Sequence, residues 1–428
     1  MTTLLIKNGR MVTNRNELIS ADIFIEEGKI QGIGKFDART VSADKVIDAA
    51  NGLITPGMVD VHVHFREPGF EYKETIETGS LSAARGGFTT VCAMPNLNPV
   101  PDTVENMELI QSLINKNAHV KILQYASITN NLRSEELVDF KGLKDAGSFA
   151  FTNDGVGVQT AGTMYLAMEA AAALNMAIVA HTEDESLLFN GVMHKGKKSE
   201  ELELPGIMSA TESSQIARDI LLAKETGVHY HVCHVSTKES VEVIRQAKLN
   251  GIHVTCEVCP HHLIMTDADI TCDHGYFKMN PPLRDNEDRQ ALIKGLLDGT
   301  IDCIATDHAP HGHEEKNQSM LKAPFGIIGS ETVFKLMYTH FVETGIFTLA
   351  DVVYWMTDAP ARIFGLEAGT LDIGTPADIA IFDIDSEVEI TKDFTSKADN
   401  TPFIGEKVKG DTLFTLVDGK IVWDKGGM

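Results

Sequence analysis

The sequence is poor in positive charge, in cysteine and in long apolar runs. Its 428 residues include 37 Lys and Arg against 61 Asp and Glu, a formal net charge of −24, which excludes a nucleic-acid binder that relies on a basic face. The longest apolar stretch, residues 166–180, is interrupted by Glu169 and Asn175 and is too short to span a bilayer. The first 17 residues lack the apolar run of a signal peptide. We therefore expect a cytoplasmic protein that binds neither nucleic acid nor membrane.

Only six cysteines occur in this long chain, too few for a disulfide framework. Cys256 and Cys259 form a C-x-x-C pair, but residues three apart on a strand face opposite sides and no second pair follows. We favour buried packing for both, with a zinc or redox role as the lesser alternative. The 16 histidines are more unusual, because they raise the question of a metal site.

Both ends of the sequence consist of short alternating segments joined by glycine-containing turns, which are typical of β-hairpins. Residues 1–55 and 368–428 are therefore predicted to pair as the two parts of one small β-sandwich domain. Between them, residues 56–367 alternate short apolar β-branched segments with helical patterns, the signature of parallel strands with crossover helices.

Eight such apolar segments can be counted, at residues 58–65, 89–95, 119–129, 148–154, 177–184, 229–237, 253–262 and 302–310. Eight units in about 300 residues favour an α/β fold of the (β/α)8 TIM-barrel type. A doubly wound sheet would carry a glycine-rich phosphate turn after its first strand, where this sequence has REPGFEYKET.

Histidine and aspartate stand at the carboxyl ends of these predicted strands. His62 and His64 are two residues apart, so on a strand they project from the same face. In four later segments, the apolar part ends at Asp154, His181, His234 and Asp307. In a barrel, these ends share the face on which active sites are built.

Four histidines and two carboxylates, with no thiolate at a strand end, suit zinc or a similar divalent ion. A single catalytic ion takes three protein ligands and a water, so six candidates predict two ions, which a carboxylate such as Asp154 can bridge. Two ions would activate a water and polarise a neighbouring carbonyl, the chemistry of amide hydrolysis or its reversal. The alternative, unrelated buried histidines at 62 and 64, would require separate hydrogen-bond partners for each.

Polar residues just beyond the strand ends are candidates for substrate binding. Arg66 follows His64 by two positions and suits bidentate recognition of a carboxylate, although an ordinary salt bridge with Glu67 is the alternative. Asn96 and Asn280 could bind substrate or merely cap turns. His311, four residues after Asp307, is a further candidate for substrate contact.

Three other histidines, His229, His231 and His253, stand at the starts or in the interiors of predicted strands. They lie away from the catalytic end of the barrel. We predict that they pack in the core and bind nothing.

Several motifs together resemble those of the bacterial type I dihydroorotases, members of the amidohydrolase superfamily. In order they are DVHVHFREPG, AMPN, TNDGVG, AHTED, CHVSTKES, CEVCPHHL, MNPPLR, ATDHAPH and APFGI. The resemblance runs through the barrel, includes NTPFIG near the C-terminus and extends to the flanking β domain. Arg66 discriminates best, because the related hydantoinases and allantoinases lack an arginine there to hold a ring carboxylate.

The resemblance implies two zinc ions per subunit. His62, His64 and Asp307 would hold one ion, and His181 and His234 the other, with Asp154 bridging them. Asp307 would also act as general base in ring opening and general acid in ring closure. The implied substrate contacts are His64, Arg66, Asn96, Asn280, His311 and the backbone of Phe325 and Gly326.

The same resemblance implies that Asp154 alone bridges the ions, since many relatives have Asp-Asp where this chain has Asn153-Asp154. Other members of the superfamily bridge with a carboxylated lysine at the end of the fourth strand. No lysine stands there in this sequence, so we expect no modified lysine.

The implied reaction is the reversible cyclisation of N-carbamoyl-L-aspartate to L-dihydroorotate in pyrimidine synthesis. Two alternatives stay open: another cyclic amidase of hydantoinase or allantoinase type, and an inactive dihydroorotase-like subunit that serves as a scaffold. An inactive subunit would be expected to have lost ligands, and none is missing here. A homodimer is the default for such an enzyme, and an association with aspartate carbamoyltransferase is left open.

Overall fold

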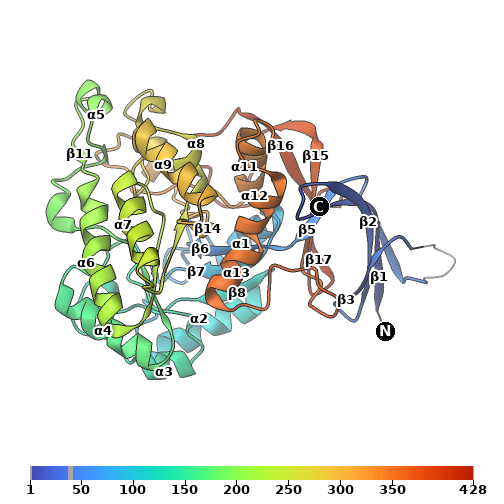
Figure 1. The fold of residues 1–428 in the computed structure, drawn as a ribbon, viewed down its shortest axis with the longest axis horizontal. Helices are drawn as coiled ribbons and strands as arrows, with labels where there is room; N and C mark the ends of the chain where they lie inside the picture. The colour runs from blue at the N-terminus through green and yellow to red at the C-terminus, as the bar shows by residue number, and fades with distance from the viewer. Residues whose placement is uncertain (1, 37–41, 428) are drawn as a thin grey trace.

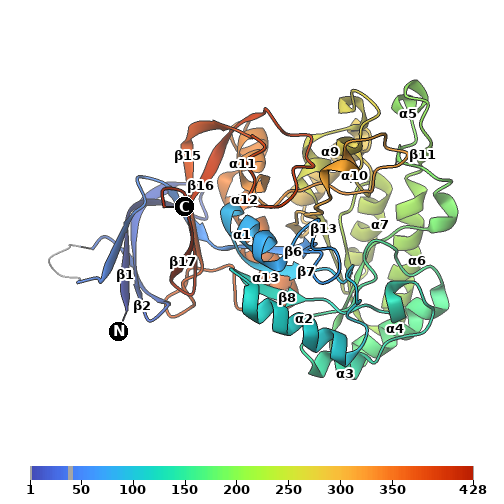
Figure 2. The same ribbon diagram turned by 180° about the vertical axis from the view of Figure 1, so that it is seen from behind.

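The computed structural model describes residues 2–36 and 42–427 of the chain. It consists of a barrel of parallel strands surrounded by helices, and a sheet built from both ends of the chain, which lies to one side of the barrel (Figure 1). Figure 2 shows the same arrangement from behind. Within the described residues, no helix is both long enough and apolar enough to span a membrane.

Eight strands form the sheet at the side of the barrel, in the order β17-β16-β15-β5-β1-β2-β3 with β4 paired to β1. Their bounds are β1 Thr3–Val12, β2 Leu18–Glu26, β3 Lys29–Gly34, β4 Lys45–Asp48, β5 Leu53–Pro56, β15 Ile379–Glu389, β16 Lys407–Val417 and β17 Lys420–Asp424. The antiparallel pair β5 and β15 joins the N-terminal strands to the C-terminal ones. Isoleucines from both halves, among them Ile6, Ile23 and Ile379, form a separate apolar cluster. The exact domain boundaries stay predictions.

The barrel strands are all parallel, in a three-stranded sheet β6-β7-β8 and a four-stranded sheet β9-β12-β13-β14. They are β6 Met58–Val63, β7 Phe88–Ala93, β8 Lys121–Gln124, β9 Ala177–Ala180, β12 His229–Val232, β13 Val254–Val258 and β14 Cys303–Ile304. Single bridges close the ring: Phe151 pairs with Ala126 and Ile178, and Val63 pairs with His308. The predicted (β/α)8 barrel is confirmed, with its fourth strand reduced to the bridge at Phe151.

The observed strands end earlier than the predicted segments because the chain leaves extended geometry where the polar side chains begin. His234, just after β12, has φ of 33°, and Asp307, just after β14, has φ of 49°. A left-handed backbone is unfavourable for residues other than glycine and is found most often where function requires it. The left-handed backbone just beyond β12 and β14 therefore marks this end of the barrel as a candidate functional site.

Helices connect the barrel strands and cover them from outside (Figures 1 and 2). Their bounds are α1 Ile76–Gly86, α2 Val104–Asn117, α3 Phe140–Asp145, α4 Ala161–Ala173, α5 Lys197–Glu201, α6 Ala210–Thr226, α7 Lys238–Leu249, α8 Pro260–Ile264, α9 Asn286–Leu297, α10 His313–Lys316, α11 Val333–Met337, α12 Leu349–Met356 and α13 Asp358–Phe364. A short pair, β10 Met193–His194 and β11 Gly206–Ile207, lies outside the barrel ring. Several helices begin after a threonine whose hydroxyl accepts a backbone N–H of the first turn, as Thr237 does before α7.

Phe382 joins the sheet to the barrel. It lies on β15 with none of its surface exposed, yet it belongs to the apolar cluster of the barrel. Its ring stacks on Phe334 of α11, with 3.9 Å between the ring centroids. The two parts therefore share one continuous core at this point.

We expect Phe382→Ala to lower the free energy of unfolding by about 3–5 kcal/mol, because it removes a fully buried ring and leaves a cavity. Urea denaturation followed by circular dichroism measures this change. Phe189→Ala is the control, since 69% of Phe189 is exposed, and its effect should stay within about 0.5 kcal/mol. Equal stabilities for the two variants would contradict the shared core.

Candidate metal and substrate site

The six predicted metal ligands lie together at the carboxyl end of the barrel strands. The side-chain donor atoms of His62, His64 and Asp307 lie within 4.8 Å of one another, and so do those of Asp154, His181 and His234. Asp154 Oδ1 lies 3.4 Å from His62 Nε2, so the two groups adjoin. The arrangement offers two neighbouring sets of three donors, which corresponds to the two ions that the sequence predicts.

Four buried side-chain atoms of the six predicted ligands lack a hydrogen-bond partner among the described residues, and two of them, His62 Nε2 and Asp154 Oδ1, lie opposite each other. Leaving buried polar atoms unsatisfied is costly, and native proteins rarely do so without a reason. Both atoms face the centre of the cluster, where His64 Nε2 also lies 3.1 Å from Asp307 Oδ1. Imidazole nitrogens and carboxylate oxygens around one point fit a divalent cation such as zinc.

The electrostatics of the cluster also favour a cation. Burial opposes a positive charge on His62, but Asp154, Asp307 and Glu257 raise its pKa well above the usual value. Burial likewise opposes ionisation of Asp307, but His62 and His64 hold its pKa well below the usual value. The carboxylates therefore stay ionised and attract positive charge to this place.

A cavity of about 170 Å³ opens above the cluster. The predicted substrate residues all line it, namely His64, Arg66, Asn96, Asn280, His311, Phe325 and Gly326. Asp154, His181, His234 and Asp307 also reach its wall, whereas His62 is completely buried. Metal and substrate candidates thus share one small polar cavity.

Arg66 is held over this cavity by its own neighbours. Its Nε donates to the carbonyl of Pro310 at 3.3 Å, and its Nη2 lies 3.3 Å from His311 Nε2. Glu67, the suspected salt-bridge partner, instead accepts the backbone N–H of Ile76 at 2.7 Å. Burial lowers the pKa of Arg66 to about 10, so it remains charged at neutral pH. An anionic group of a ligand can therefore meet the guanidinium.

The two asparagines do more than cap turns. Asn96 Nδ2 donates to the carbonyl of Asp154 at 2.6 Å, while its Oδ1 is buried without a partner among the described residues. Asn280 Nδ2 donates to Glu183 Oε1 at 2.8 Å. Each amide is thereby fixed at the cavity wall and retains hydrogen-bonding capacity for a ligand.

Asn153 faces away from the cluster. Its Oδ1 accepts the backbone N–H groups of Ile128 and Thr129, and its Nδ2 donates to Thr129 Oγ1 and to the carbonyl of Leu132. This side chain fixes the loop after β8 and takes no part in the predicted metal set. Asp154 is thus the carboxylate at the end of the fourth barrel segment that enters the cluster.

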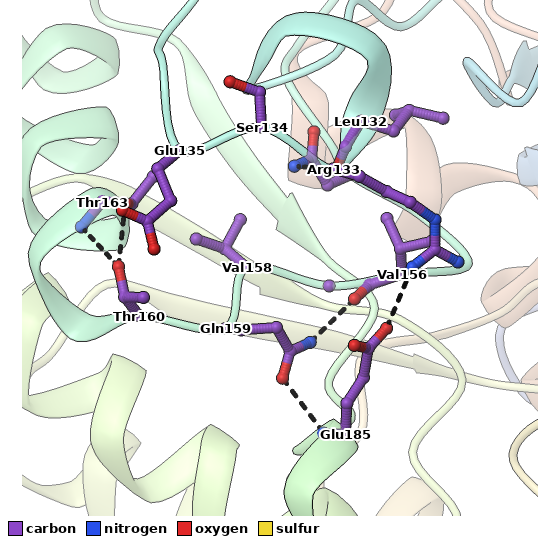
Figure 3. Close-up of a pocket in the computed structure, with 12 residues that line it drawn as sticks. Leu132, Arg133, Ser134, Glu135, Val156, Val158, Gln159, Thr160, Thr163 and Glu185 are labelled. Atoms are coloured by element: carbon purple, nitrogen blue, oxygen red, sulfur yellow. Dashed lines mark hydrogen bonds and ion pairs between the residues drawn. The ribbon is translucent and has the colours of Figure 1, made fainter.

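A second pocket, which Asn153 helps to line, is formed by the loop after β8 and the start of α4 (Figure 3). Gln159 crosses it, donating to the carbonyl of Val156 and accepting the backbone N–H of Glu185, and Arg133 pairs with the Glu185 carboxylate at 3.3 Å. This ion pair is largely exposed to solvent. Among the described residues, none of the six predicted metal ligands and no histidine or cysteine lines this pocket, whereas the cavity above the cluster brings metal and substrate candidates together.

Two acidic residues that were not predicted from the sequence contact the imidazole rings of predicted ligands. Glu257 of β13 is fully buried and its Oε1 lies 2.7 Å from His62 Nδ1. Burial opposes its ionisation, but His62 and His231 lower its pKa to about 2. Glu183 Oε2 lies 3.7 Å from His181 Nε2. An ionisable residue inside an apolar strand, as in TCEVC, was the available signal for Glu257.

Asn400 and Lys316 hold the backbone of the predicted Phe325 and Gly326 contacts in place. Asn400 Nδ2 donates to the carbonyls of Ala309 and Gly326, and its Oδ1 accepts the N–H of His311. Lys316 is fully buried and its Nζ donates to three carbonyls, including that of Gly326 at 2.7 Å. The motif NTPFIG marks Asn400 in the sequence, but nothing there indicates its partners.

Comparison with known proteins gives a consistent picture. Residues 51–240 match a family model described as dihydro-orotase-like. A dihydroorotase of Enterococcus faecalis is 68% identical over 423 residues, which cover 98% of this chain and 99% of the relative. A dihydroorotase of Ligilactobacillus salivarius is 62% identical over 424 residues, with the same shares covered.

Solved structures with the same fold include an L-hydantoinase (dihydropyrimidinase) from Arthrobacter aurescens, with a TM-score of 0.88 and 30% identity over 99% of this chain and 97% of that one. A D-hydantoinase (dihydropyrimidinase) from a Thermus species aligns with a TM-score of 0.84 and 26% identity, over 99% and 96% of the two chains. The barrel and its flanking sheet are thus shared with cyclic amidases of known structure.

Proposed function

Because the chain belongs to the dihydroorotase family, we propose that it interconverts N-carbamoyl-L-aspartate and L-dihydroorotate in pyrimidine synthesis. Membership makes it an enzyme, a cyclic amide hydrolase, since relatives named dihydroorotase are 59–68% identical over nearly its whole length. The observation that carries the proposal is the cavity in which Arg66 faces the cluster of four histidines and two carboxylates. In this cavity Arg66 would bind the free carboxylate of the substrate, and the cluster would act on the amide at its other end.

We propose two zinc ions as the metal of this metal-dependent family. His62, His64 and Asp307 would hold one ion and His181 and His234 the other, with Asp154 between them, as the two donor groups allow. When bound, the ions would supply Lewis acidity for the amide carbonyl and lower the pKa of water. The unpartnered His62 Nε2 and Asp154 Oδ1 support this proposal.

The protein's own residues would bind and orient the substrate. Arg66 would hold the free carboxylate through two parallel N–H donors. Asn96, Asn280 and His311, with the backbone of Phe325 and Gly326, would fix the ring by hydrogen bonds along the cavity wall. Holding the ring in one orientation aligns the scissile amide with the cluster and removes much of the entropic barrier.

Asp307 would move the proton. Its carboxylate lies at the junction of the cluster and the cavity, with Oδ1 3.3 Å from His62 Nε2 and 3.1 Å from His64 Nε2. In ring opening it would accept a proton from the attacking water and deliver it to the departing amide nitrogen. In ring closure the same carboxylate would run these transfers in reverse.

A hydantoinase activity is the main rival, because the fold is shared with hydantoinases at 30% identity or less. The higher identity to dihydroorotases and the half-buried Arg66 in the cavity wall favour an anionic substrate over an uncharged ring. An inactive scaffold is disfavoured, since the six predicted ligands are all in place.

The cell compartment and assembly follow as further proposals. All six cysteines are free, and five of them are buried, which agrees with a reducing cytoplasm. We propose that the protein is a homodimer in the cytoplasm. A complex with aspartate carbamoyltransferase would be formed by this dimer.

A substrate comparison tests the proposed function. We expect zinc-loaded protein to hydrolyse L-dihydroorotate at least about 100-fold more efficiently than hydantoin or allantoin, because only the first offers Arg66 a carboxylate. Spectrophotometric assays of kcat/KM for the three compounds measure this preference, with His62→Ala as the inactive control. Turnover of hydantoin without turnover of dihydroorotate would contradict the proposal.

A further inference from the structure

We propose that Glu257 is a positioning residue of the metal centre, and that a column of hydrogen bonds through His231, Thr255 and His229, buried at Glu257 and half-buried at its far end, fixes it. The inference rests on the proposed function, because it concerns the histidines that would hold the ions. It assigns a role to residues that the sequence places only in the barrel core.

Glu257 contacts two neighbouring predicted ligands at once. Its Oε1 lies 2.7 Å from His62 Nδ1 and accepts the backbone N–H of His234 at 3.3 Å. Its Oε2 lies 3.1 Å from His231 Nε2. Glu257, His62 and His231 all have none of their surface exposed. A carboxylate in this position ties the side chain of one ligand to the backbone of another.

The column continues away from the metal cluster, toward the other end of the barrel. His231 Nδ1 lies 2.8 Å from Thr255 Oγ1, and the same hydroxyl lies 2.7 Å from His229 Nε2. The pairing of β12 with β13 produces this contact, since His231 and Thr255 are register partners. His229, which is half-buried, in turn stacks on the exposed His253, with 4.3 Å between the ring centroids. Of the three histidines predicted to pack in the core, only His231 is fully buried.

The chemistry of the donors assigns each proton in this column. An ionised carboxylate can only accept, so His62 Nδ1 and His231 Nε2 must both donate to Glu257. In a neutral His231 ring, Nδ1 is then an acceptor, and the hydroxyl of Thr255 donates a hydrogen bond to it. The Thr255 oxygen is left to accept from His229 Nε2. Every member has one role, and no donor meets another donor.

This order leaves Nε2 as the His62 ring nitrogen that faces the cluster, the atom through which this imidazole can bind a metal. Metal-binding histidines commonly donate their second ring N–H to a carboxylate, and such partners contribute to metal affinity. His62 Nε2 is also one of the buried atoms without a partner among the described residues. Glu257 therefore prepares His62 for the ion, and His231 and Thr255 keep Glu257 in that state.

Glu257→Gln tests the inference in the full-length protein. Glutamine keeps the size of the side chain, but its NH2 group must face either His62 or His231 and so opposes one of the two donors. We expect zinc affinity, measured by competition with a chromophoric chelator, to fall about 10–100-fold. Thr255→Val removes only the hydroxyl and should weaken zinc binding about 2–5-fold, since it acts through His231.

Asp219→Asn is the matched control. Asp219 is also fully buried and accepts the hydroxyl of Tyr230 at 3.0 Å, but it lies on α6, apart from the cluster. We expect it to lower the thermal unfolding temperature of the metal-free protein while zinc affinity stays at the wild-type value. Thermal unfolding of metal-free Glu257→Gln, followed in parallel, separates a loss of folding from a loss of binding.

The outcomes distinguish this inference from the proposed function. Wild-type zinc affinity in both Glu257→Gln and Thr255→Val would overturn the positioning role even if the wild type hydrolyses dihydroorotate. Should Glu257→Gln fail to fold, Thr255→Val decides alone, and unchanged zinc affinity in it refutes the column. Zinc binding without dihydroorotate turnover in the wild type would contradict the proposed function only, because the column could still govern the metal.

Discussion

Replacing Asp307 with asparagine is expected to lower kcat for dihydroorotate hydrolysis by about 10³-fold or more. The side chain keeps its size, but the amide cannot accept and return the proton, a role that contributes about 10²–10⁴-fold in other enzymes. It also removes a carboxylate that lies 3.3 Å from His62 Nε2, so metal binding should weaken as well. Steady-state rates at saturating zinc measure the first effect, and chelator competition measures the second.

Asp302→Asn serves as the control for Asp307→Asn. Asp302 stands just before β14, at the opposite end of the strand from Asp307, where it pairs with Lys248 at 2.6 Å. We expect its kcat to stay within about 3-fold of wild type, since no group of the cavity is changed. Asp307→Asn with more than a tenth of wild-type kcat would show that another residue moves the proton.

Replacing Arg66 with methionine is expected to reduce kcat/KM for dihydroorotate by about 10²–10³-fold. Losing one partner of a buried charge pair costs about 2–5 kcal/mol, and Arg66 lies in the cavity wall with its guanidinium Nη2 3.3 Å from His311 Nε2. Methionine retains the apolar contacts of the arginine stem, so the cavity should keep its shape.

Dihydrouracil, the same ring without its carboxylate, separates recognition from folding in the Arg66 variant. Its hydrolysis by the wild type should already be slow, and Arg66→Met should change it by less than about 3-fold, because it offers no anion to the arginine. An equal loss for both compounds would mean that Arg66 acts by supporting the loop and not by binding the carboxylate.

The placement of the site could be predicted from the sequence because it depends on local rules. His62 and His64 share a face through the two-residue period of a strand, and Asp307 ends a strand of a barrel whose strand ends converge. These relations need no knowledge of how distant segments pair. The same period predicted a cavity position for Arg66, and Arg66 does line the cavity. However, β6 ends at Val63 and the φ of Arg66 is 62°, so a left-handed backbone and not the strand period brings it there.

The supporting residues could not be predicted, because their roles arise from pairing across the fold. Asn400 accepts the backbone N–H of His311, which is 89 residues away in the sequence. Glu257 contacts His62, which is 195 residues away. His231 was expected to pack in the core, and it is buried, but its partner depends on the register of β12 against β13. Burial was foreseeable there, and hydrogen-bond partners were not.

The net charge of −24 has to be compared with the local charge at this site. The bulk field of the protein opposes the approach of an anionic substrate. Arg66 and the predicted ions would reverse the sign of the field within the cavity, since bound divalent ions are the largest local charges. Substrate attraction would then be a local property of the barrel mouth, and we expect it to weaken when the metal is removed.

Zinc titration of the metal-depleted protein tests the central claim most directly. The rate of dihydroorotate hydrolysis is followed as zinc is added, together with bound metal by mass spectrometry. We predict negligible rate without zinc, and a rise that saturates at about two equivalents per chain, because six donors form two adjoining sets. Full activity in the metal-free protein, or saturation at one equivalent, would contradict a two-metal dihydroorotase.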